Sequence, residues 1–225
     1  MLSPPYGGEV VTLVGIAADV ERVPVLRGLD LHVGAGESVG LTGANGAGKS
    51  TLLRVVGTLL PPAGGEGRVL GATLGTDECR AVRPRISLVG HTPALYSRLT
   101  LLENLSFVAR LVGRTEREAA EALDAVGLAR AADRRAEACS QGMCRRAELA
   151  RVLLTEPALL LLDEAHAGLD AESAELVEVV VERVCHRGGA CLVVSHDQPR
   201  LAAAVDRVVA LTGGALAEPR TGTPV

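Results

Sequence analysis

Aromatic residues and excess positive charge are both scarce in this 225-residue sequence. Tyr6, Tyr96 and Phe107 are the only aromatic residues, and tryptophan is missing. A protein that binds single-stranded nucleic acid by base stacking needs a larger set. The 23 Lys and Arg residues against 27 Asp and Glu give a formal net charge of -4. Because no basic excess is there to displace counterions from a phosphate backbone, we expect no nucleic-acid partner.

Long hydrophobic runs are missing as well. A helix that spans a bilayer needs roughly 18 to 20 apolar residues, and the clearest runs, 158–162 and 190–194, are far shorter. The first residues, MLSPPYGGEV, contain neither the basic start nor the apolar segment of a secretory signal. The sequence therefore predicts a soluble, cytosolic protein that reaches a membrane only through a partner.

The cysteines form no C-x-x-C pair. Their spacing matches neither a zinc site nor a small disulfide framework, so we expect free thiols of the kind found in cytosolic proteins. The five are Cys79, Cys139, Cys144, Cys185 and Cys191.

Short apolar runs alternate with helical patterns along the chain, which is typical of an α/β protein with a parallel sheet. The length fits a single domain over 1–225. The first two strands are expected to be antiparallel edge strands. The runs at 159–162 and 191–194 are apolar at every position, which predicts strands covered by helices on both faces. The strands expected are 10–16, 26–33, 38–42, 86–89, 159–162, 191–194 and 208–211.

Two helix starts are marked by a threonine followed three residues later by a glutamate. Thr100 with Glu103 and Thr115 with Glu118 both fit a capping box, in which each residue satisfies the other's backbone N–H. The helices expected from these starts cover 101–112 and 116–126, and Gly127 ends the second.

The region around these helices interrupts the alternation of strand and helix. We interpret about 92–155 as a helical subdomain inserted into the α/β core. The segment 61–67, PPAGGEG, is expected to be a turn between elements, and the tail 218–225 to be loose.

Residues 43–50, GANGAGKS, match the phosphate-loop pattern G-x-x-x-x-G-K-[ST]. An expected strand, 38–42, precedes the loop and an expected helix, 51–60, follows it. Glycines let the backbone turn tightly and direct its N–H groups at phosphate oxygens, and the start of the helix adds its positive dipole end. The alternative is a glycine-rich turn with a surface lysine, which the strand–turn–helix context disfavours.

Each residue type in this loop has a distinct role in nucleotide binding. Lys49 supplies a point charge for the β- and γ-phosphates, and Ser50 offers a hydroxyl to Mg²⁺. The loop alone does not choose among kinases, GTPases, helicases and transporters. The residues expected to hold the nucleotide are Gly43, Ala44, Asn45, Gly46, Ala47, Gly48, Lys49, Ser50 and Thr51.

Acidic and imidazole side chains follow two of the buried strands. Asp163 and Glu164 come directly after one of them, at the carboxyl edge where ligands bind in open α/β sheets. Asp163 would hold Mg²⁺ through water, and Glu164 would polarise the attacking water as general base. His196, after 191–194, would hydrogen-bond the γ-phosphate or that water. Surface acids and an incidental histidine are the plainer alternative.

The ordered set of motifs resembles the ABC ATPases over nearly the whole chain. Its pieces are GANGAGKST, then CSQGM, LLLLDE, AGLD and SHD, with the region 88–105 as a further match. The resemblance implies a P-loop NTPase core with a mostly parallel sheet, an antiparallel β edge subdomain and an inserted helical subdomain. It also implies an ATPase that uses ATP and Mg²⁺.

The segment 139–143, CSQGM, is similar to the signature of this family, which is usually L-S-G-G-Q. Ser140 and Gly142 match, and the other three residues depart from it. Ser140 is also a good N-cap for a helix expected over 145–154, whose N-terminus would face an anion. Taken alone, the segment is no more than an ordinary helix cap.

The resemblance implies that one chain does not form a complete site. In the family, the signature binds the γ-phosphate of the ATP held by the opposite subunit. Two copies of this chain, or this chain and a related subunit, would therefore enclose two ATP molecules head to tail. The residues that would reach the second subunit's ATP are Ser140, Gln141, Gly142 and Asp170.

Two positions depart from the family pattern. His91 stands where the family usually has a glutamine that contacts Mg²⁺ and water and senses the membrane subunit; its charge can vary with pH. Val20 takes the place of the aromatic residue that stacks on adenine, so an apolar contact would replace stacking.

Residues 90–111, GHTPALYSRLTLLENLSFVARL, are similar to the ATP-binding subunits of the haem exporters of cytochrome c maturation. Exporters of lipids or drugs share parts of this segment. The resemblance implies a subunit at the cytoplasmic face of the plasma (inner) membrane, bound there through integral membrane subunits. Two alternatives remain, a soluble ABC ATPase of translation or DNA repair and a nucleotide kinase; the kinase leaves CSQGM, AGLD and SHD unexplained.

Overall fold

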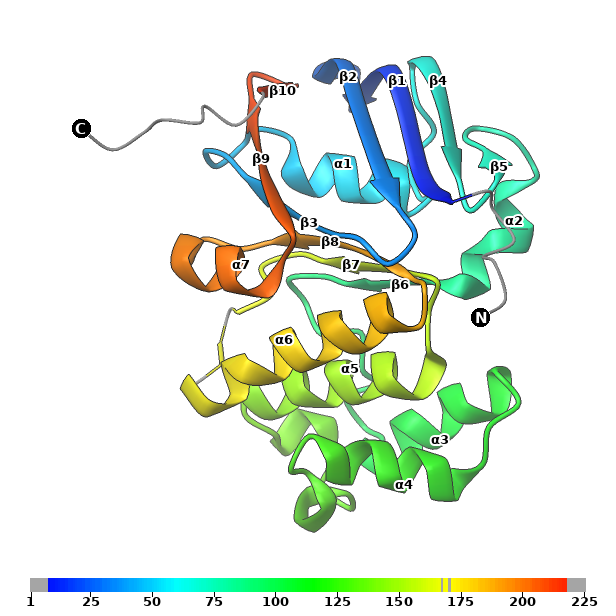
Figure 1. Cartoon of the computed structure of the whole chain (residues 1–225). Helices are drawn as coiled ribbons and strands as arrows, with labels where there is room; N and C mark the ends of the chain where they lie inside the picture. The colour runs from blue at the N-terminus through cyan, green and yellow to red at the C-terminus, as the bar shows by residue number, and fades with distance from the viewer. Residues whose placement is uncertain (1–7, 167, 170, 218–225) are drawn as a thin grey trace.

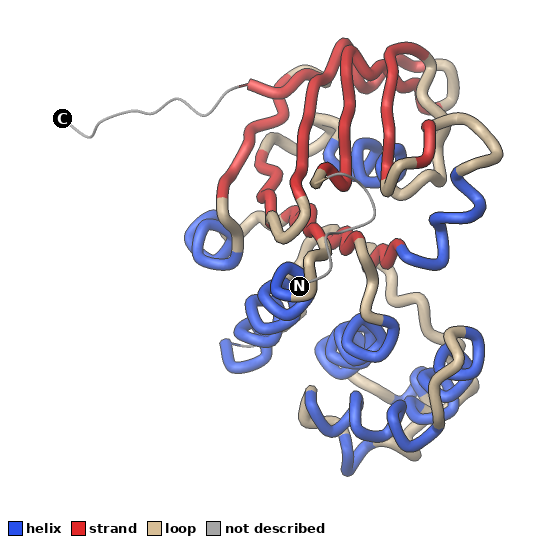
Figure 2. The backbone as a smooth tube through the Cα atoms, turned by 45° about the vertical axis from the view of Figure 1, so that its right-hand side comes forward, coloured by secondary structure: helices blue, strands red, loops and turns tan. Residues whose placement is uncertain are grey.

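The computed structural model describes residues 8–166, 168–169 and 171–217. Its elements form layers (Figure 1), with an antiparallel sheet, the helix α1 (Lys49–Val56), a central sheet and a set of helices stacked in that order. Viewed from a second direction, the strands of both sheets and the lower helices keep this layered order (Figure 2). The predicted α/β fold class is therefore confirmed.

The central sheet has the strand order β10-β9-β3-β8-β7-β6. Neighbouring strands pair in parallel except β9 and β10, which are antiparallel. The mostly parallel sheet was expected, and the strands over 38–42, 86–89 and 159–162 have the predicted bounds. The strands are β3 (Ser38–Thr42), β6 (Ile86–Val89), β7 (Leu159–Leu162), β8 (Ala190–Val194), β9 (Arg207–Thr212) and β10 (Ala215–Ala217).

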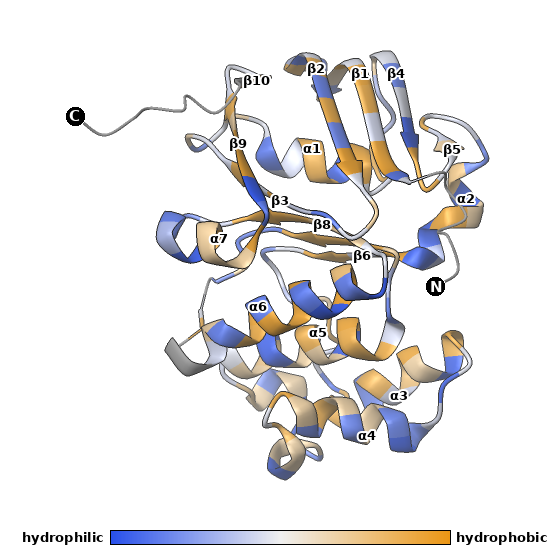
Figure 3. Ribbon diagram, in the orientation of Figure 1, coloured by the Kyte–Doolittle hydropathy of each residue, from blue (hydrophilic) through white to orange (hydrophobic). Residues whose placement is uncertain are grey.

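Alternate side chains of the central strands enter two different hydrophobic cores. Leu159 and Leu161 of β7 pack into the core shared with α1 and the antiparallel sheet, whereas Leu160 and Leu162 pack against the helices on the other face. All four side chains are fully buried. Residues of β8 likewise divide between the two cores, and apolar colour runs along β8 and β6 (Figure 3). The expectation of strands covered on both faces is confirmed.

The antiparallel sheet has the order β2-β1-β4-β5, formed by β1 (Glu9–Val20), β2 (Val23–Gly34), β4 (Gly64–Val69) and β5 (Ala72–Thr73). The antiparallel pairing of the first two strands is confirmed, but only β2 lies at an edge.

The expectation that both were edge strands was wrong because β4 pairs with β1 on its other side. The assignment of 61–67 to a turn was also wrong over its last residues. They belong to β4, where Gly65 adopts a φ of +82° and a Cβ would collide with the Gly15 carbonyl. Only glycine fits this irregular pairing.

Most of the remaining helices lie below the central sheet, whereas α7 lies at its left end and α2 at the right of the view, below β5 (Figure 1). Those between β6 and β7 occupy the region expected to be helical. The helices are α2 (Cys79–Val82), α3 (Leu101–Leu111), α4 (Glu116–Ala125), α5 (Gln141–Thr155), α6 (Ala171–His186) and α7 (Gln198–Ala204), with short 3₁₀ turns at Arg83–Arg85, Ala129–Ala131 and Ala136–Ala138.

Both predicted capping boxes form. The Thr100 hydroxyl accepts from the Glu103 N–H at 3.1 Å, and the Glu103 carboxylate accepts from the Thr100 N–H at 2.8 Å. Thr115 and Glu118 repeat the pattern. Hydrogen bonds from the Thr115 N–H and hydroxyl lower the pKa of Glu118 to about 2. The helices begin where expected because their first N–H groups are satisfied there.

The predicted bounds of two helices were wrong. The helix expected over 51–60 is α1, which begins at Lys49 and ends at Val56, because Thr58 has a left-handed φ of +58°. The helix expected over 145–154 is α5, which begins directly after Ser140.

Two of the cysteines touch each other. All five are free thiols, and the sulfurs of Cys185 in α6 and Cys191 in β8 lie 3.7 Å apart.

Within the part of the chain that the structure describes, no helix combines the length and apolar character needed to cross a bilayer.

Candidate functional site

The glycine-rich loop joins β3 to α1 through three glycines with positive φ. Gly43, Gly46 and Gly48 have φ of +145°, +77° and +104°. Gly48 is the N-cap of α1 and gives no side-chain hydrogen bond to the helix. Because glycine has no side chain, the first N–H groups of α1 are left without a side-chain cap and can bind an anion.

Lys49 lies across this loop. Its Nζ donates to the carbonyl oxygens of Gly43 at 2.7 Å and Ala44 at 3.0 Å, and the residue is 8% exposed. These two bonds use two of the three ammonium donors. The loop carbonyl groups thus hold the Lys49 ammonium group beside the N-terminus of α1.

A cavity of about 420 Å³ opens beside the loop. It brings together predicted residues from four separate parts of the chain: the end of β1, the phosphate loop, the end of β7 and the end of β8. Gly43, Ala44, Ala47 and His91 are not among its lining residues. The residues that line it are Val20, Val25, Asn45, Gly46, Gly48, Lys49, Ser50, Thr51, Asp163, Glu164, Val194 and His196.

Asp163 and Glu164 lie at the carboxyl edge of the central sheet. The Asp163 N–H donates to the Val89 carbonyl at 2.9 Å, and the Ala165 N–H donates to the Val194 carbonyl at 2.9 Å. Between them, Glu164 has a left-handed φ of +54°. For a residue other than glycine this conformation costs about 1–2 kcal/mol. It persists because the hydrogen bonds on either side fix the turn.

The Glu164 carboxylate lies between two histidines. His91 Nδ1 is 2.8 Å from Glu164 Oε2, and His196 Nε2 is 3.7 Å from Glu164 Oε1. The histidines come from loops after β6 and β8, and the Glu164 side chain is 31% exposed. Both imidazoles can therefore orient this carboxylate.

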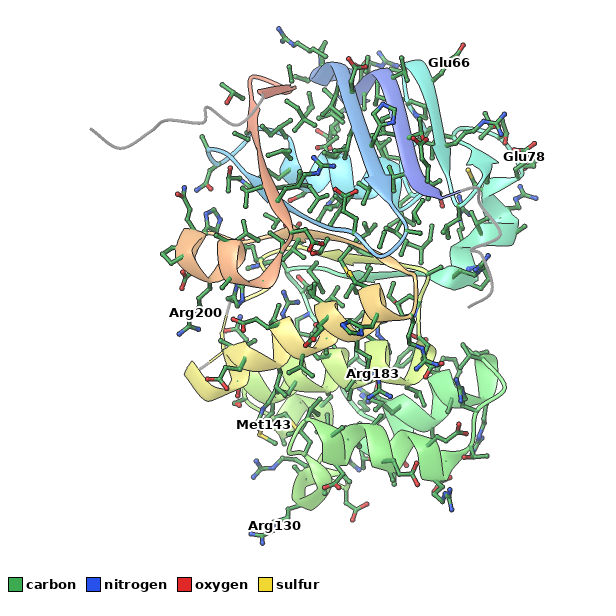
Figure 4. The ribbon with its side chains drawn as sticks, viewed as in Figure 1. Glu66, Glu78, Arg130, Met143, Arg183 and Arg200 are labelled. Carbon is green, nitrogen blue, oxygen red and sulfur yellow. The ribbon has the colours of Figure 1, made fainter. Side chains whose placement is uncertain are left out.

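Ser140 is the N-cap of α5, and its hydroxyl accepts from the Met143 N–H at 3.2 Å. Met143, in the first turn, lies in the helical layer below the central sheet (Figure 4). Neither Ser140, Gln141 nor Gly142 is among the residues that line the 420 Å³ cavity. A Cβ on Gly142 would lie 2.9 Å from the Gly168 carbonyl, so the turn packs closely on that loop. Asp170 lies outside the described residues.

Sequence reasoning missed two buried charged residues of α5 behind the site. Arg145, 5% exposed, donates to the carbonyl oxygens of Gly90, Asp163 and Glu164 at 2.8, 2.8 and 2.7 Å. Burial lowers the pKa of Arg145. Glu148, 0% exposed, accepts from the Ala94 N–H at 3.0 Å. No motif marks these residues, and charged residues of a helix are ordinarily expected at the surface.

His166 is a further residue that the sequence did not single out. Its Nδ1 lies 2.9 Å from the Ser195 hydroxyl, which also accepts from the Asp197 N–H at 3.1 Å. Burial lowers the pKa of His166. This imidazole therefore joins the turn after Glu164 to the start of the SHD segment.

The donor set of the cavity suits a hard cation that also binds phosphate. Among the described residues, no cluster of three His, Cys, Asp or Glu side chains is placed to hold a metal ion alone. The Ser50 hydroxyl and the Asp163 carboxylate nevertheless line the same cavity. Mg²⁺ commonly takes one or two protein oxygens and completes its shell with phosphate and water, so these residues fit Mg²⁺ bound together with a nucleotide.

Comparison with known proteins gives one consistent family. A family model described as "ABC transporter" matches residues 26–167. The phosphonates import ATP-binding protein of Chromohalobacter salexigens is 39% identical over 205 residues, which cover 84% of this chain and 75% of that protein. The lipoprotein-releasing system ATP-binding protein of Anaeromyxobacter dehalogenans is 38% identical over 95% of both chains. The daunorubicin/doxorubicin resistance ATP-binding protein of Streptomyces peucetius is 40% identical, with 87% of this chain and 60% of that protein covered.

Solved structures give the same fold. A dimeric ATP-binding cassette in a post-hydrolysis state, bound to ADP and phosphate, superimposes with a TM-score of 0.82 at 26% identity, over 92% of this chain and 97% of that one. A dimeric bacterial ABC transporter cassette superimposes with a TM-score of 0.84 at 26% identity over the same fractions. The chain therefore belongs to the ABC transporter family, as an ATP-binding subunit with ATPase activity.

Proposed function

We propose that this chain powers a membrane transporter by hydrolysing ATP in the 420 Å³ cavity, with Glu164 as general base. The observation that carries this proposal is the convergence of Lys49, Ser50, Asp163 and Glu164 on one cavity. The phosphate-binding groups come from the loop after β3 and the base from the end of β7, so one cavity holds the groups that in-line attack on a γ-phosphate requires.

The loop holds the triphosphate by its backbone and by Lys49. The N–H groups of residues 43–51 and the start of α1 bind phosphate oxygens, and Lys49 exchanges its carbonyl partners for the β- and γ-phosphates. Ser50 and Asp163, with His91 nearby, are proposed to hold Mg²⁺. When bound, Mg²⁺ neutralises charge that develops on the phosphates.

Glu164 accepts a proton from the attacking water. His91 and His196 hold its carboxylate from two sides, which limits the directions in which it can point. His196 lines the cavity and is proposed to hydrogen-bond the γ-phosphate or the water.

The segment Ser140, Gln141 and Gly142, together with Asp170, is proposed to bind the ATP of a second subunit. Two observations support this: the segment is absent from the lining of its own chain's cavity, and structurally similar cassettes are dimers. Ser140 opens a helix of 15 residues, whose N-terminus attracts an anion. A head-to-tail dimer would place that N-terminus against the γ-phosphate of the other chain.

Val20 is proposed to contact the nucleobase. It lines the cavity together with Val25, and both side chains are aliphatic. Because aliphatic contacts lack the directional preference of ring stacking, adenine would be held with little discrimination from guanine.

The helical region 92–155 is proposed to be a subdomain that passes movement to a membrane subunit through the segment from His91 to Arg110. Tyr96 and Phe107 form an edge-to-face pair with ring centroids 5.6 Å apart, yet they are 60% and 44% exposed. Leu111, one helical turn beyond Phe107, is 71% exposed. Such a surface suits contact with an apolar partner. We propose that this surface meets integral membrane subunits, through which the chain is bound at the cytoplasmic face of the plasma (inner) membrane.

The nature of the cargo is a finer proposal, which rests on residues 90–111 alone. Their similarity to haem exporters favours export of haem. The relatives described above are named for phosphonate import, lipoprotein release and drug resistance, so they support transport and do not support haem. The family match disfavours the alternative kinase, and a soluble ATPase of translation or DNA repair would need no membrane partner.

Replacement of Glu164 by Gln tests the proposed base. The amide keeps the size of the side chain and its contacts with the histidines, but it does not accept a proton. We expect kcat for ATP to fall by about 10²–10⁴-fold, the usual contribution of a general base, while ATP binding persists and a dimer becomes detectable by size-exclusion chromatography.

Glu182→Gln is the matched control. Glu182 lies on α6 with a side chain 71% exposed, 3.6 Å from His186, and its replacement should leave turnover unchanged. Normal ATP turnover by Glu164→Gln would overturn the assignment of the base.

A further inference from the structure

Arg145 connects three segments that are distant in sequence. Its Nη1 donates to the Gly90 carbonyl, immediately before His91, and its Nη2 donates to the carbonyls of Asp163 and Glu164. The three distances, 2.8, 2.8 and 2.7 Å, are those of good charge-assisted hydrogen bonds. One guanidinium therefore fixes the backbone of the proposed base and the turn that carries its histidine partner.

Glu148 holds this guanidinium from within α5. Its Oε2 is 3.5 Å from Arg145 Nη1, and its Oε1 accepts from the Ala94 N–H at 3.0 Å. A second cation, Arg151, lies 3.9 Å from Oε1 and donates to the Leu88 carbonyl at 3.2 Å. The carboxylate thus ties both the arginine and the loop after His91 to the same helix.

A buried ion pair of this kind is weak evidence for a purely stabilising role. Desolvation of two charges costs about as much as their attraction returns, and apolar residues of similar size often serve the fold as well. Arginine is nevertheless suited to this position because its planar guanidinium carries several donors in a fixed fork. A lysine presents a single charged nitrogen and does not span the three carbonyl oxygens in the same way.

We propose that Arg145, held by Glu148, is a positioning residue that fixes Glu164 and His91 relative to the helix that begins at Ser140. This inference rests on the proposed role of Glu164. Because α5 starts at the segment proposed to meet the second subunit's ATP, closure of the dimer would act on the base through this rigid connection. Arg145 is not among the residues that line the nucleotide cavity, and it acts on the site through backbone carbonyl groups.

The test compares Arg145→Met, Arg145→Lys and Arg146→Met in steady-state ATP hydrolysis by the full chain. We expect kcat to fall by about 10–100-fold in both Arg145 variants, because displacement of a reacting group by about 1 Å costs about that much. KM for ATP should change by less than about twofold, since the phosphate loop is untouched. Arg146 is the matched control, because it neighbours Arg145 on α5 but its Nη1 donates to the Val126 carbonyl, at 3.5 Å, away from Gly90, Asp163 and Glu164.

The variant Arg145→Met/Glu148→Gln covers the case in which Arg145→Met fails to fold. The glutamine still accepts from the Ala94 N–H and leaves no unpaired buried carboxylate, so the core is restored without the link to Gly90, Asp163 and Glu164. We expect this variant to unfold close to the wild-type temperature and to retain the low kcat. Recovery of wild-type kcat in it would overturn the inference.

A double-mutant cycle separates this inference from the proposed role of Glu164. In single-turnover hydrolysis, Arg145→Met/Glu164→Gln should be no slower than Glu164→Gln alone, because a positioning residue has nothing left to position. Additive losses would contradict the inference. If Glu164→Gln itself hydrolyses ATP normally, the assignment of the base fails instead; if only Arg145→Met does so, the inference fails and the base stands.

Discussion

The glycines of the phosphate loop permit a graded test of how tightly the surrounding structure defines that loop. Each of Gly43, Gly46 and Gly48 is replaced by alanine in turn. A Cβ on Gly46 meets no atom within 4 Å, so only its φ of +77° opposes the substitution. The left-handed conformation costs an alanine about 1–2 kcal/mol. We expect Gly46→Ala to lower the free energy of unfolding by that amount.

The two other positions add a steric penalty. At Gly48 the new Cβ would lie 2.9 Å from a Leu26 methyl carbon and 3.1 Å from a Val25 methyl carbon. These side chains can shift at the usual cost of overpacking, about 1–3 kcal/mol, so the total is about 2–5 kcal/mol. At Gly43 the Cβ would collide with the backbone oxygen of Leu211 in β9. A backbone oxygen has no rotamer to change, so β9 would have to separate from β3.

Equilibrium unfolding in urea, followed by circular dichroism, measures the series. We expect the loss of stability to increase from Gly46→Ala to Gly48→Ala to Gly43→Ala, with the last protein poorly folded or insoluble. The lower entropy of the unfolded alanine chain offsets each value by about 0.4–1 kcal/mol and leaves the order unchanged. If Gly46→Ala were as destabilising as Gly43→Ala, the reasoning from these contacts would be refuted.

Two further predictions concern a helix cap and an acid. Ser140→Ala should cost about 0.5–2 kcal/mol of stability, as loss of an N-cap does, and should also weaken the ATP-dependent dimer of the Glu164→Gln protein in sedimentation; Thr115→Ala, which removes a cap of α4 instead, should cost similar stability and leave the dimer intact. Hydrogen bonds from the Ser38 hydroxyl and N–H lower the pKa of Asp206 below its ordinary value of 3.8. Because a depressed pKa stabilises the folded state above the unfolded pKa, this contribution is present above pH 3.8 and is lost as the pH falls through the folded value. Asp206→Asn should therefore flatten the acid side of a plot of melting temperature against pH, and an unchanged slope would contradict this account.

The sequence specified the central sheet more completely than the antiparallel one. Strands such as β7 are apolar at every position, and a short apolar run between turn residues has few other structures available. β4 was missed because four of the six residues in Gly64–Val69 (GGEGRV) are glycine or glutamate, which are depleted in strands. Its pairing with β1 depends on tertiary contacts that no local pattern reveals.

The site was predictable where a motif carries its own chemistry. The phosphate loop, Asp163 and Glu164 could be named because glycines, a lysine and strand-end acids have functional meaning at fixed spacing. The contact between His91 and Glu164 could not be derived, since two loops far apart in sequence form it. Arg145 and Glu148 were missed for the same reason: which charged side chains of α5 turn inward is decided by the loops that pack on them.

At Glu164, the left-handed φ makes the residue proposed for ATP turnover also a residue that lowers thermal stability. An asparagine or glycine adopts that conformation more readily than a glutamate. Selection for thermal stability alone would therefore favour replacement of Glu164 by one of these residues. Random mutagenesis with a heat challenge would thus enrich inactive protein at this codon, unless hydrolysis is scored in the same screen. The strained turn at the end of β7 is therefore expected to persist only where ATP hydrolysis is selected together with stability.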